Sequence, residues 1–174
     1  MVGWSLAEAE SKTHARRLIQ ETCRRQGVEK DQLVIHADRG SPMIAGSVAE
    51  LMKKLGVAKS HSRPRVLNDN PYIESHFKTL KYRPNYPERF DSITAARSWC
   101  RTFFNWYNEV HYHSGIGYLR PADLHAGRHE IVVQARQATL DAAAQKHPER
   151  FTKRPTPHRV PTKAWINQRT AKSA

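Results

Sequence analysis

The strongest constraint on the fold is a short apolar run that leads directly into a carboxylate. Residues 33–35 are Leu, Val and Ile, residues 36–37 are His and Ala, and Asp38 follows before a Gly-Ser-Pro turn at 40–42. A β-rich run bounded by turn formers predicts a buried strand. Because α/β sheets usually place functional groups at the carboxyl ends of their strands, Asp38 is a candidate site residue.

A second carboxylate, Glu74, lies near the start of a predicted helix. Residues 69–81 carry apolar side chains at helical spacing, and Pro71 suits the first helical position, where its missing amide costs nothing. Glu74 flanks the apolar stripe, and Lys78 and Lys81 follow it at intervals of four and three on one face. Such a face is either an ordinary salt-bridge surface or a set of phosphate contacts, and the two interpretations are compatible.

The two acids and the residues around them resemble the catalytic core of insertion-sequence transposases and retroviral-type integrases, the Asp-Asp-Glu enzymes of the RNase H-like superfamily. Residues 36–41 resemble the second-Asp motif of that family and residues 69–81 resemble its Glu motif, with 35 residues between Asp38 and Glu74. The resemblance continues to residues 121–124. It implies an α/β fold of the RNase H-like integrase type over residues 1–126.

The first Asp of the family motif has no obvious counterpart here, because it belongs to a strand that should precede the matched region. The acidic residues before Asp38 are all predicted on the first helix or in the loop after it: Glu8, Glu10, Glu21, Glu29 and Asp31. We therefore expect an N-terminally truncated core, with an unpaired sheet edge, that is the C-terminal portion of a transposase and is inactive alone.

The resemblance implies metal-dependent DNA strand cleavage and transfer, with Mg²⁺ or Mn²⁺ held by carboxylates. Asp38 and Glu74 are the catalytic and metal-binding candidates, and whether the chain itself is an enzyme stays open without the first Asp. The DNA-binding candidates are Lys78, Lys81, Arg63, Arg65 and Arg39. The expected partners are element ends and target DNA, a second copy of the chain, or an intact transposase. The alternative is a non-catalytic remnant that binds DNA or a partner.

Charge supports a nucleic-acid partner. The chain has 29 Lys and Arg against 16 Asp and Glu, a formal charge of +13, and such an excess attracts polyanions. A basic RNA-binding or ribosomal protein would also have this charge, but that assignment would not explain the spacing of Asp38 and Glu74. Two isolated cysteines and no apolar segment of membrane-spanning length predict a cytoplasmic protein, associated with the nucleoid when bound to DNA.

The remaining elements follow from periodicity and caps. A capping-box pattern at 5–8 predicts the start of a helix that Gly27 ends. We expect a second helix ending at Gly56, a short strand at 57–61, a loop at 82–91 and an aromatic-rich helix from Ser92 or Thr94 to about Val110. Its aromatic residues are interpreted as core, and His111 with His113 lacks the further ligands of a zinc site.

The end of the chain differs in character from residues 1–126. Residues 130–146 predict a modest helix with a weak stripe at Ile131, Val132, Ala135, Ala138 and Ala142. From His147 onward prolines alternate with Lys and Arg, which predicts an extended or disordered basic tail. Residues 127–174 are therefore expected to form a separate segment.

Overall fold

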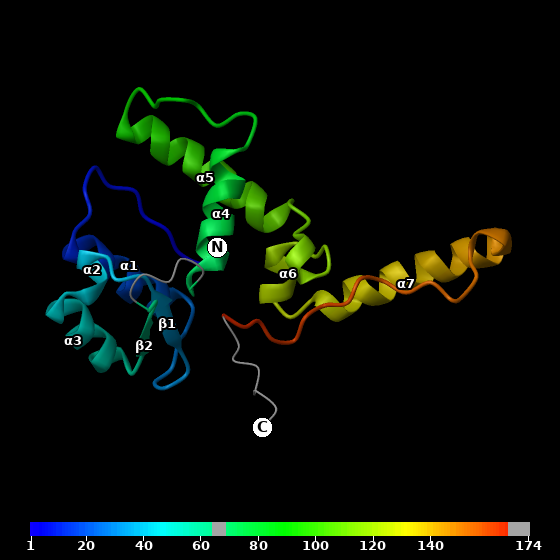
Figure 1. Ribbon diagram of the computed structural model, residues 1–174, viewed down its shortest axis with the longest axis horizontal. Helices are drawn as coiled ribbons and strands as arrows, with labels where there is room; N and C mark the ends of the chain where they lie inside the picture. Colours follow the sequence, from blue (N-terminus) through cyan, green and yellow to red (C-terminus); the bar gives the residue numbers. More distant parts are fainter. Residues whose placement is uncertain (64–68, 167–174) are drawn as a thin grey trace. The chain divides into compact units, whose positions relative to one another are not determined.

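A computed structural model describes residues 1–63 and 69–166, which divide into two compact units (Figure 1). The strand unit comprises residues 2–98 with Trp165 and Ile166, and the helical unit comprises Met1 and residues 99–164. The long helix α5, Ile93–Glu109, begins in the strand unit and ends in the helical unit. No helix in the part of the chain that the structure describes is long and apolar enough to cross a bilayer.

The strand unit is built on two parallel strands, β1 (Val34–Ala37) and β2 (Ala58–His61), in the register Val34 with Ala58 and Ala37 with His61. The same unit contains three helices: α1 (Lys12–Arg25), α2 (Ser41–Ile44) and α3 (Gly46–Leu55). The chain between β1 and β2 runs through α2 and α3, as a parallel pair requires. The core lies between helices and strands: Ile19, Cys23, Val48, Leu51, Met52 and Val57.

The predicted strand is present but is shifted and is not buried. The sequence predicts it at residues 33–35, whereas β1 runs from Val34 to Ala37. Leu33 and Ile35 pack against the helical core, while Val34 is 62% exposed. Because successive strand residues point to opposite faces, a sheet covered on one face leaves every second side chain open.

The first helix begins later than its sequence pattern predicts. The capping-box pattern at Ser5 does not start a helix, and Ser11 is the N-cap of α1, where its Oγ accepts from the backbone N–H of His14 at 3.1 Å. The Leu6 carbonyl instead accepts from the Arg97 guanidinium at 3.2 Å, so this segment is bound to α5. The predicted end is confirmed, since Gly27 has a φ of 61°, the left-handed conformation that glycine adopts readily.

The other predicted elements of the strand unit are confirmed. Helix α3 ends at Leu55 with Gly56 in the left-handed region, and β2 lies within the expected 57–61 segment. Helix α4 (Pro71–Lys81) begins with Pro71, although Asn70 makes no side-chain cap bond. Helix α5 is capped by Ser92, whose Oγ accepts from the Ala95 amide at 3.1 Å.

An aromatic cluster forms the centre of the helical unit. Phe103 is 2% exposed and stacks on Trp99 with ring centroids 5.4 Å apart. Tyr107 stacks on His111 at 5.3 Å, and His113 meets Tyr107 edge-on. These aromatic residues are therefore core, as predicted.

The rest of the helical unit consists of two helices, two short 3₁₀ turns and an extended segment: α6 (Pro121–His125), α7 (His129–Lys146), η2 (Ser114–Ile116) and η3 (Pro148–Arg150). Residues 151–164, called the strap here, return along α7 in an extended conformation (Figure 1, orange to red). The stripe predicted on α7 is wrong: Ile131 is 69% exposed. The strap contacts Gln137 and Asp141 instead.

Candidate active site and its supporting contacts

Asp38 lies immediately beyond the carboxyl end of β1, and its position is fixed on two sides. Its Oδ1 accepts from the Gly40 amide at 3.0 Å, a local turn that orients the carboxylate. Its backbone carbonyl accepts from His61 Nδ1 at 3.0 Å, so the end of β2 holds the end of β1. The side chain is exposed and lines a cavity of about 460 Å³. A ligand in solution can therefore reach this carboxylate.

Glu74 occupies the first turn of α4 and is also exposed. No hydrogen bond or ion pair occupies its carboxylate within the ranges that the structure describes. A carboxylate near a helix N-terminus is stabilised by the helix dipole. Lys78 and Lys81 follow in the last turn and are exposed as well.

The segments that carry the two acids are tied together by His36. Its Nε2 donates to the carbonyl oxygen of Asp69 at 2.9 Å, and its Nδ1 accepts from the Ser60 hydroxyl at 3.0 Å. His36 lies two residues before Asp38, and Asp69 lies five residues before Glu74. The side chain of a strand residue thus links β2 to the start of α4, although no described contact joins the two candidate carboxylates directly.

Asp69 is fixed by a second interaction, with Arg63. The Asp69 side chain is buried and accepts from Arg63 three times: from the backbone amide at 2.8 Å, from Nε at 2.9 Å and from Nη2 at 2.8 Å. This pairing raises the pKa of Arg63. The Arg63 guanidinium, predicted to contact DNA, is thus engaged at the entrance to α4. Arg39 is exposed, and Arg65 lies outside the described residues.

The donor chemistry of the two acids suits a hard divalent cation, which prefers oxygen ligands. Within residues 1–63 and 69–166, however, no group of three or more His, Cys, Asp and Glu side chains is placed to hold a metal ion. Of the acids before Asp38, Glu8 and Glu10 precede α1 and were wrongly assigned to the first helix or the loop after it, whereas the other three lie there as predicted; none of the five is on β1 or β2. Asp38 and Glu74 each stay candidate ligands.

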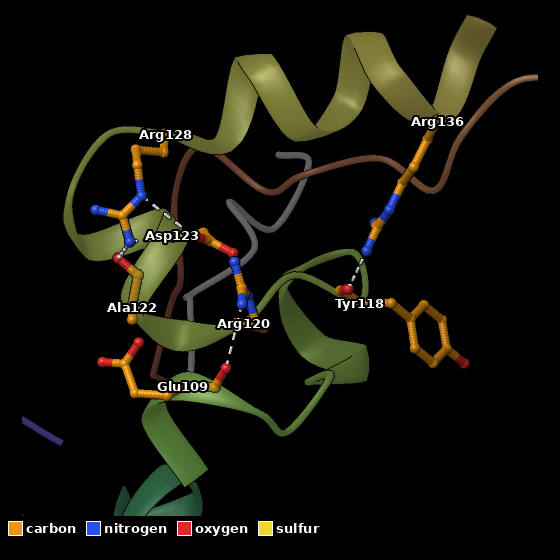
Figure 2. A network of polar contacts seen from close by, with 7 residues as sticks. All are labelled: Glu109, Tyr118, Arg120, Ala122, Asp123, Arg128 and Arg136. Atoms are coloured by element: carbon orange, nitrogen blue, oxygen red, sulfur yellow. Dashed lines mark hydrogen bonds and ion pairs between the residues drawn. The ribbon is translucent and has the colours of Figure 1, made fainter. Parts of the chain in front are cut away.

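The sequence did not indicate the most buried carboxylate of the helical unit, Asp123. It is 3% exposed and accepts from Arg120 Nε at 2.6 Å and from Arg128 Nη2 at 3.1 Å (Figure 2). Hydrogen bonds from Arg120, and then from Arg128, hold the pKa of Asp123 below its ordinary value despite burial. The i,i+3 spacing of Arg120 and Asp123 was the available signal, but surface pairs at this spacing are common. Each cation has a full partner, so this network stabilises the fold.

Comparison with known proteins places the two candidate acids in context. A family model described as integrase core domain matches residues 55–121, which include Glu74. The chain is 29% identical over 126 residues to the transposase for insertion sequence element IS904 of Lactococcus lactis subsp. lactis (strain IL1403), which covers 71% of the chain and 49% of that protein. Residues 55–121 are therefore similar to an integrase core domain. The chain's resemblance to the transposase and integrase core is thereby confirmed.

Two further proteins are similar to this chain. The insertion element IS600 uncharacterized 31 kDa protein of Shigella sonnei is 31% identical over 100 residues, which are 57% of the chain and 37% of that protein. A cryo-EM structure of the simian T-cell lymphotropic virus intasome in complex with PP2A regulatory subunit B56 gamma matches with a TM-score of 0.51 and 16% identity, over 68% of the chain and 41% of the matched chain. This last likeness shows an α/β integrase-like fold.

The chain spans about half, or less, of the length of these curated relatives. Proteins with an integrase core generally bind DNA and use a divalent metal ion, which agrees with the expected class of partner and cofactor. The individual roles of Asp38, Glu74 and the basic residues stay predictions.

Proposed function

We propose that this chain binds DNA as part of a transposase-type recombinase and contributes Asp38 and Glu74 to its metal-dependent site. The observation that carries the proposal is the link from His36 to Asp69, which ties the strand end bearing Asp38 to the helix bearing Glu74. The match of residues 55–121 to the integrase core and the similarity to the IS904 transposase support the same assignment.

The two carboxylates would be ligands for Mg²⁺ or Mn²⁺. When bound, such an ion activates an attacking hydroxyl and stabilises the leaving oxygen in phosphoryl transfer. The chain's own contribution is position: Gly40 and His61 orient Asp38, while the first turn of α4 presents Glu74 to solvent. Lys78 and Lys81, further along α4, would contact DNA phosphates near the two acids.

The isolated chain should not catalyse the reaction. The described part of the chain has no strand-borne acid before Asp38, and a third carboxylate would complete the acidic set. We therefore infer that Asp38 and Glu74 need a further carboxylate ligand for catalysis. Purified chain incubated with Mg²⁺ and duplexes carrying element ends is expected to give no nicked or joined products on a denaturing gel. Strand cleavage that Asp38→Asn abolishes would contradict this.

Metal binding tests the roles of the two acids. We expect the wild-type chain to bind Mn²⁺ measurably by electron paramagnetic resonance, and Asp38→Asn and Glu74→Gln each to weaken binding about tenfold because each removes a charged oxygen ligand. Glu50→Gln, an exposed acid on α3, is the matched control and should leave binding unchanged. Equal Mn²⁺ binding by all four proteins would reject the proposed ligands.

A second candidate function is a non-catalytic DNA-binding or partner-binding remnant, and the free edge of β1 favours it. The carbonyls of Leu33 and Ala37 accept from Ala58 and Ser62 on the β2 side. In a parallel strand the intervening residues direct their backbone groups to the opposite edge, where no described strand pairs with Val34 or His36. Such an edge accepts an added strand.

Two experiments distinguish the remnant from the metal-binding core. Unchanged DNA affinity and Mg²⁺ response in Asp38→Asn and Glu74→Gln would favour the remnant. Val34→Pro removes one of the outward N–H groups of β1 and places a ring at the free edge, so it disfavours strand addition without breaking the β1–β2 ladder. If the edge is an interface, wild-type chain forms a complex with a full-length transposase of the matched family in light-scattering chromatography, and the Pro variant does not.

A further inference from the structure

The strap is held to the helical unit by contacts on one side. Arg154 donates through Nε and Nη2 to the two oxygens of Asp141, at 3.0 and 2.8 Å. Gln137 Nε2 donates to the Pro155 carbonyl at 3.0 Å, and the His158 and Tyr118 rings lie 4.7 Å apart. These contacts involve a guanidinium, a carbonyl and an aromatic ring, and they fix the path of the strap.

The remaining cations of the strap form no ion pair with any acid in residues 1–63 and 69–166. Asp141 is paired with Arg154, and Glu149 lies near His147 and Arg150. Among the described residues, no ion pair involves the exposed cations at the end of α7 and along the strap: Lys146, Lys153, Arg159 and Lys163. Asp141 and Glu149 are thus already paired with other side chains, and the charge of these four cations is exposed to solvent.

The geometry of the strap suits a long polyanion. An extended chain rises about 3.1 Å per residue, so the ten steps from Lys153 to Lys163 reach about 30 Å, close to the length of one turn of B-form DNA. Pro155, Pro157 and Pro161 restrict the backbone before binding, which reduces the entropy lost on association. Clustered cations on a pre-ordered segment favour sequence-independent contact with phosphates.

We propose that the strap, with Lys146, is a second surface for the backbone of duplex DNA, separate from α4 and outside residues 55–121, which the integrase core model matches. It adds affinity and not sequence preference, because phosphate contacts carry no base information. The inference shares with the proposed function its partner, DNA, but requires neither the metal nor the two acids.

The test compares two triple variants of equal charge. Lys153→Gln, Arg159→Gln and Lys163→Gln remove three strap cations. The control, Lys12→Gln, Arg16→Gln and Lys54→Gln, removes three exposed cations from α1 and α3. The affinity of each full chain for a fluorescein-labelled 25-base-pair duplex of arbitrary sequence is measured by anisotropy in EDTA at several salt concentrations.

The strap variant should bind at least about tenfold more weakly at low salt, and its plot of log affinity against log salt should be shallower by about 2 to 3, since each lost phosphate contact removes about 0.9 from the slope. The control should keep the wild-type slope. Equal losses in the two variants, an unchanged strap variant, or tighter wild-type binding to single-stranded RNA than to the duplex would overturn the proposal.

A separate variant keeps the strap surface distinct from the proposed function. Lys78→Gln with Lys81→Gln removes the α4 cations and leaves the strap intact. If that double variant binds the duplex normally while the strap variant does not, the α4 contacts of the proposed function fail and the strap surface stands. The reverse result would reject the strap and retain α4.

Discussion

The carbonyl oxygen of Asp69 lies 2.9 Å from Nε2 of His36, which joins a strand residue to the segment that begins α4. Since His36 Nδ1 also meets the Ser60 hydroxyl, one imidazole connects β1, β2 and the entrance to α4. The two residues are 33 positions apart in the sequence, too far for a local pattern to predict the contact. The relative placement of the strand and helix that carry the candidate acids depends on it.

His36→Ala should therefore lower the free energy of unfolding by about 1–2 kcal/mol, because it removes two half-buried hydrogen bonds, to the Ser60 hydroxyl and to the Asp69 carbonyl. Urea unfolding measures this change. Ser62→Ala, which removes a hydroxyl 3.4 Å from His36 Nε2, is the control and should cost under about 0.5 kcal/mol because that contact is long. Equal effects would show that the imidazole is not the link.

Asp123→Asn should destabilise the helical unit and make its free energy of unfolding depend less on pH in the acid range. The bonds from Arg120 and Arg128 place the folded-state pKa of Asp123 below its ordinary value, which is about 3.9 for an unfolded chain. A lowered carboxyl pKa gives stability that is fully present above about pH 5 and is lost as the pH falls toward the folded value. Urea unfolding at pH 7, 5, 4 and 3 measures this stability.

The free energy of unfolding of Asp123→Asn should be about 1.5–3 kcal/mol below that of the wild type at pH 7, because charged hydrogen bonds are replaced by neutral ones. The difference should narrow steadily toward pH 3. Asp91→Asn, an exposed acid in the loop before α5, should follow the wild type throughout. A constant difference at every pH would contradict ionic stabilisation by Asp123.

The sequence predicted elements whose cause is local. The structure confirms three such features: the apolar stripe and glycine stop of α3, Pro71 at the start of α4, and Ser92 before α5. Each depends on neighbours within one or two helical turns. Asp38 at a strand end and Glu74 in a first helical turn were placed correctly for the same reason. Their shared role depends on tertiary contacts, and so it stays a prediction.

The features that the sequence missed depend on partners far along the chain. The capping-box pattern at Ser5 starts no helix, and the next carbonyl, on Leu6, accepts a hydrogen bond from the distant Arg97. The stripe on α7 failed because the strap, whose return path no local pattern predicts, selects the face bearing Gln137 and Asp141. Residues 151–164 are extended, and the basic, proline-rich composition gave no indication of the contacts that fix them.

Met52→Ala should show how far the strand unit depends on its small core. Met52 is 1% exposed between α1, α3 and the strands, so truncation removes buried area and leaves a cavity, at a cost of about 2–5 kcal/mol. Ile44→Ala is the control, because Ile44 is 56% exposed and should cost under about 1 kcal/mol. Thermal unfolding followed by circular dichroism measures both, and similar losses would contradict this packing.

Gly117→Ala should release the strap from the helical unit. Gly117 has a φ of 69°, and an added Cβ would lie 2.8 Å from the Arg159 carbonyl oxygen and 3.2 Å from the Arg159 carbonyl carbon. The clash is with backbone, which cannot rotate away, so the strap must shift. Trypsin cleavage after Lys153, Arg159 and Lys163 should become several-fold faster, because protease acts on segments that have left the surface. Timed digestion with mass spectrometry measures the rates.

Gly127→Ala isolates the clash from backbone strain. Gly127 has a φ of 70°, almost that of Gly117, but a Cβ there would meet no atom within 4 Å. Both substitutions carry the cost of about 1 kcal/mol for a non-glycine residue in the left-handed region, and only Gly117→Ala displaces the strap. Gly127→Ala should therefore lower stability while its strap is cleaved at the wild-type rate. Equal acceleration in the two variants would mean that general destabilisation, and not contact with Arg159, controls access to the strap.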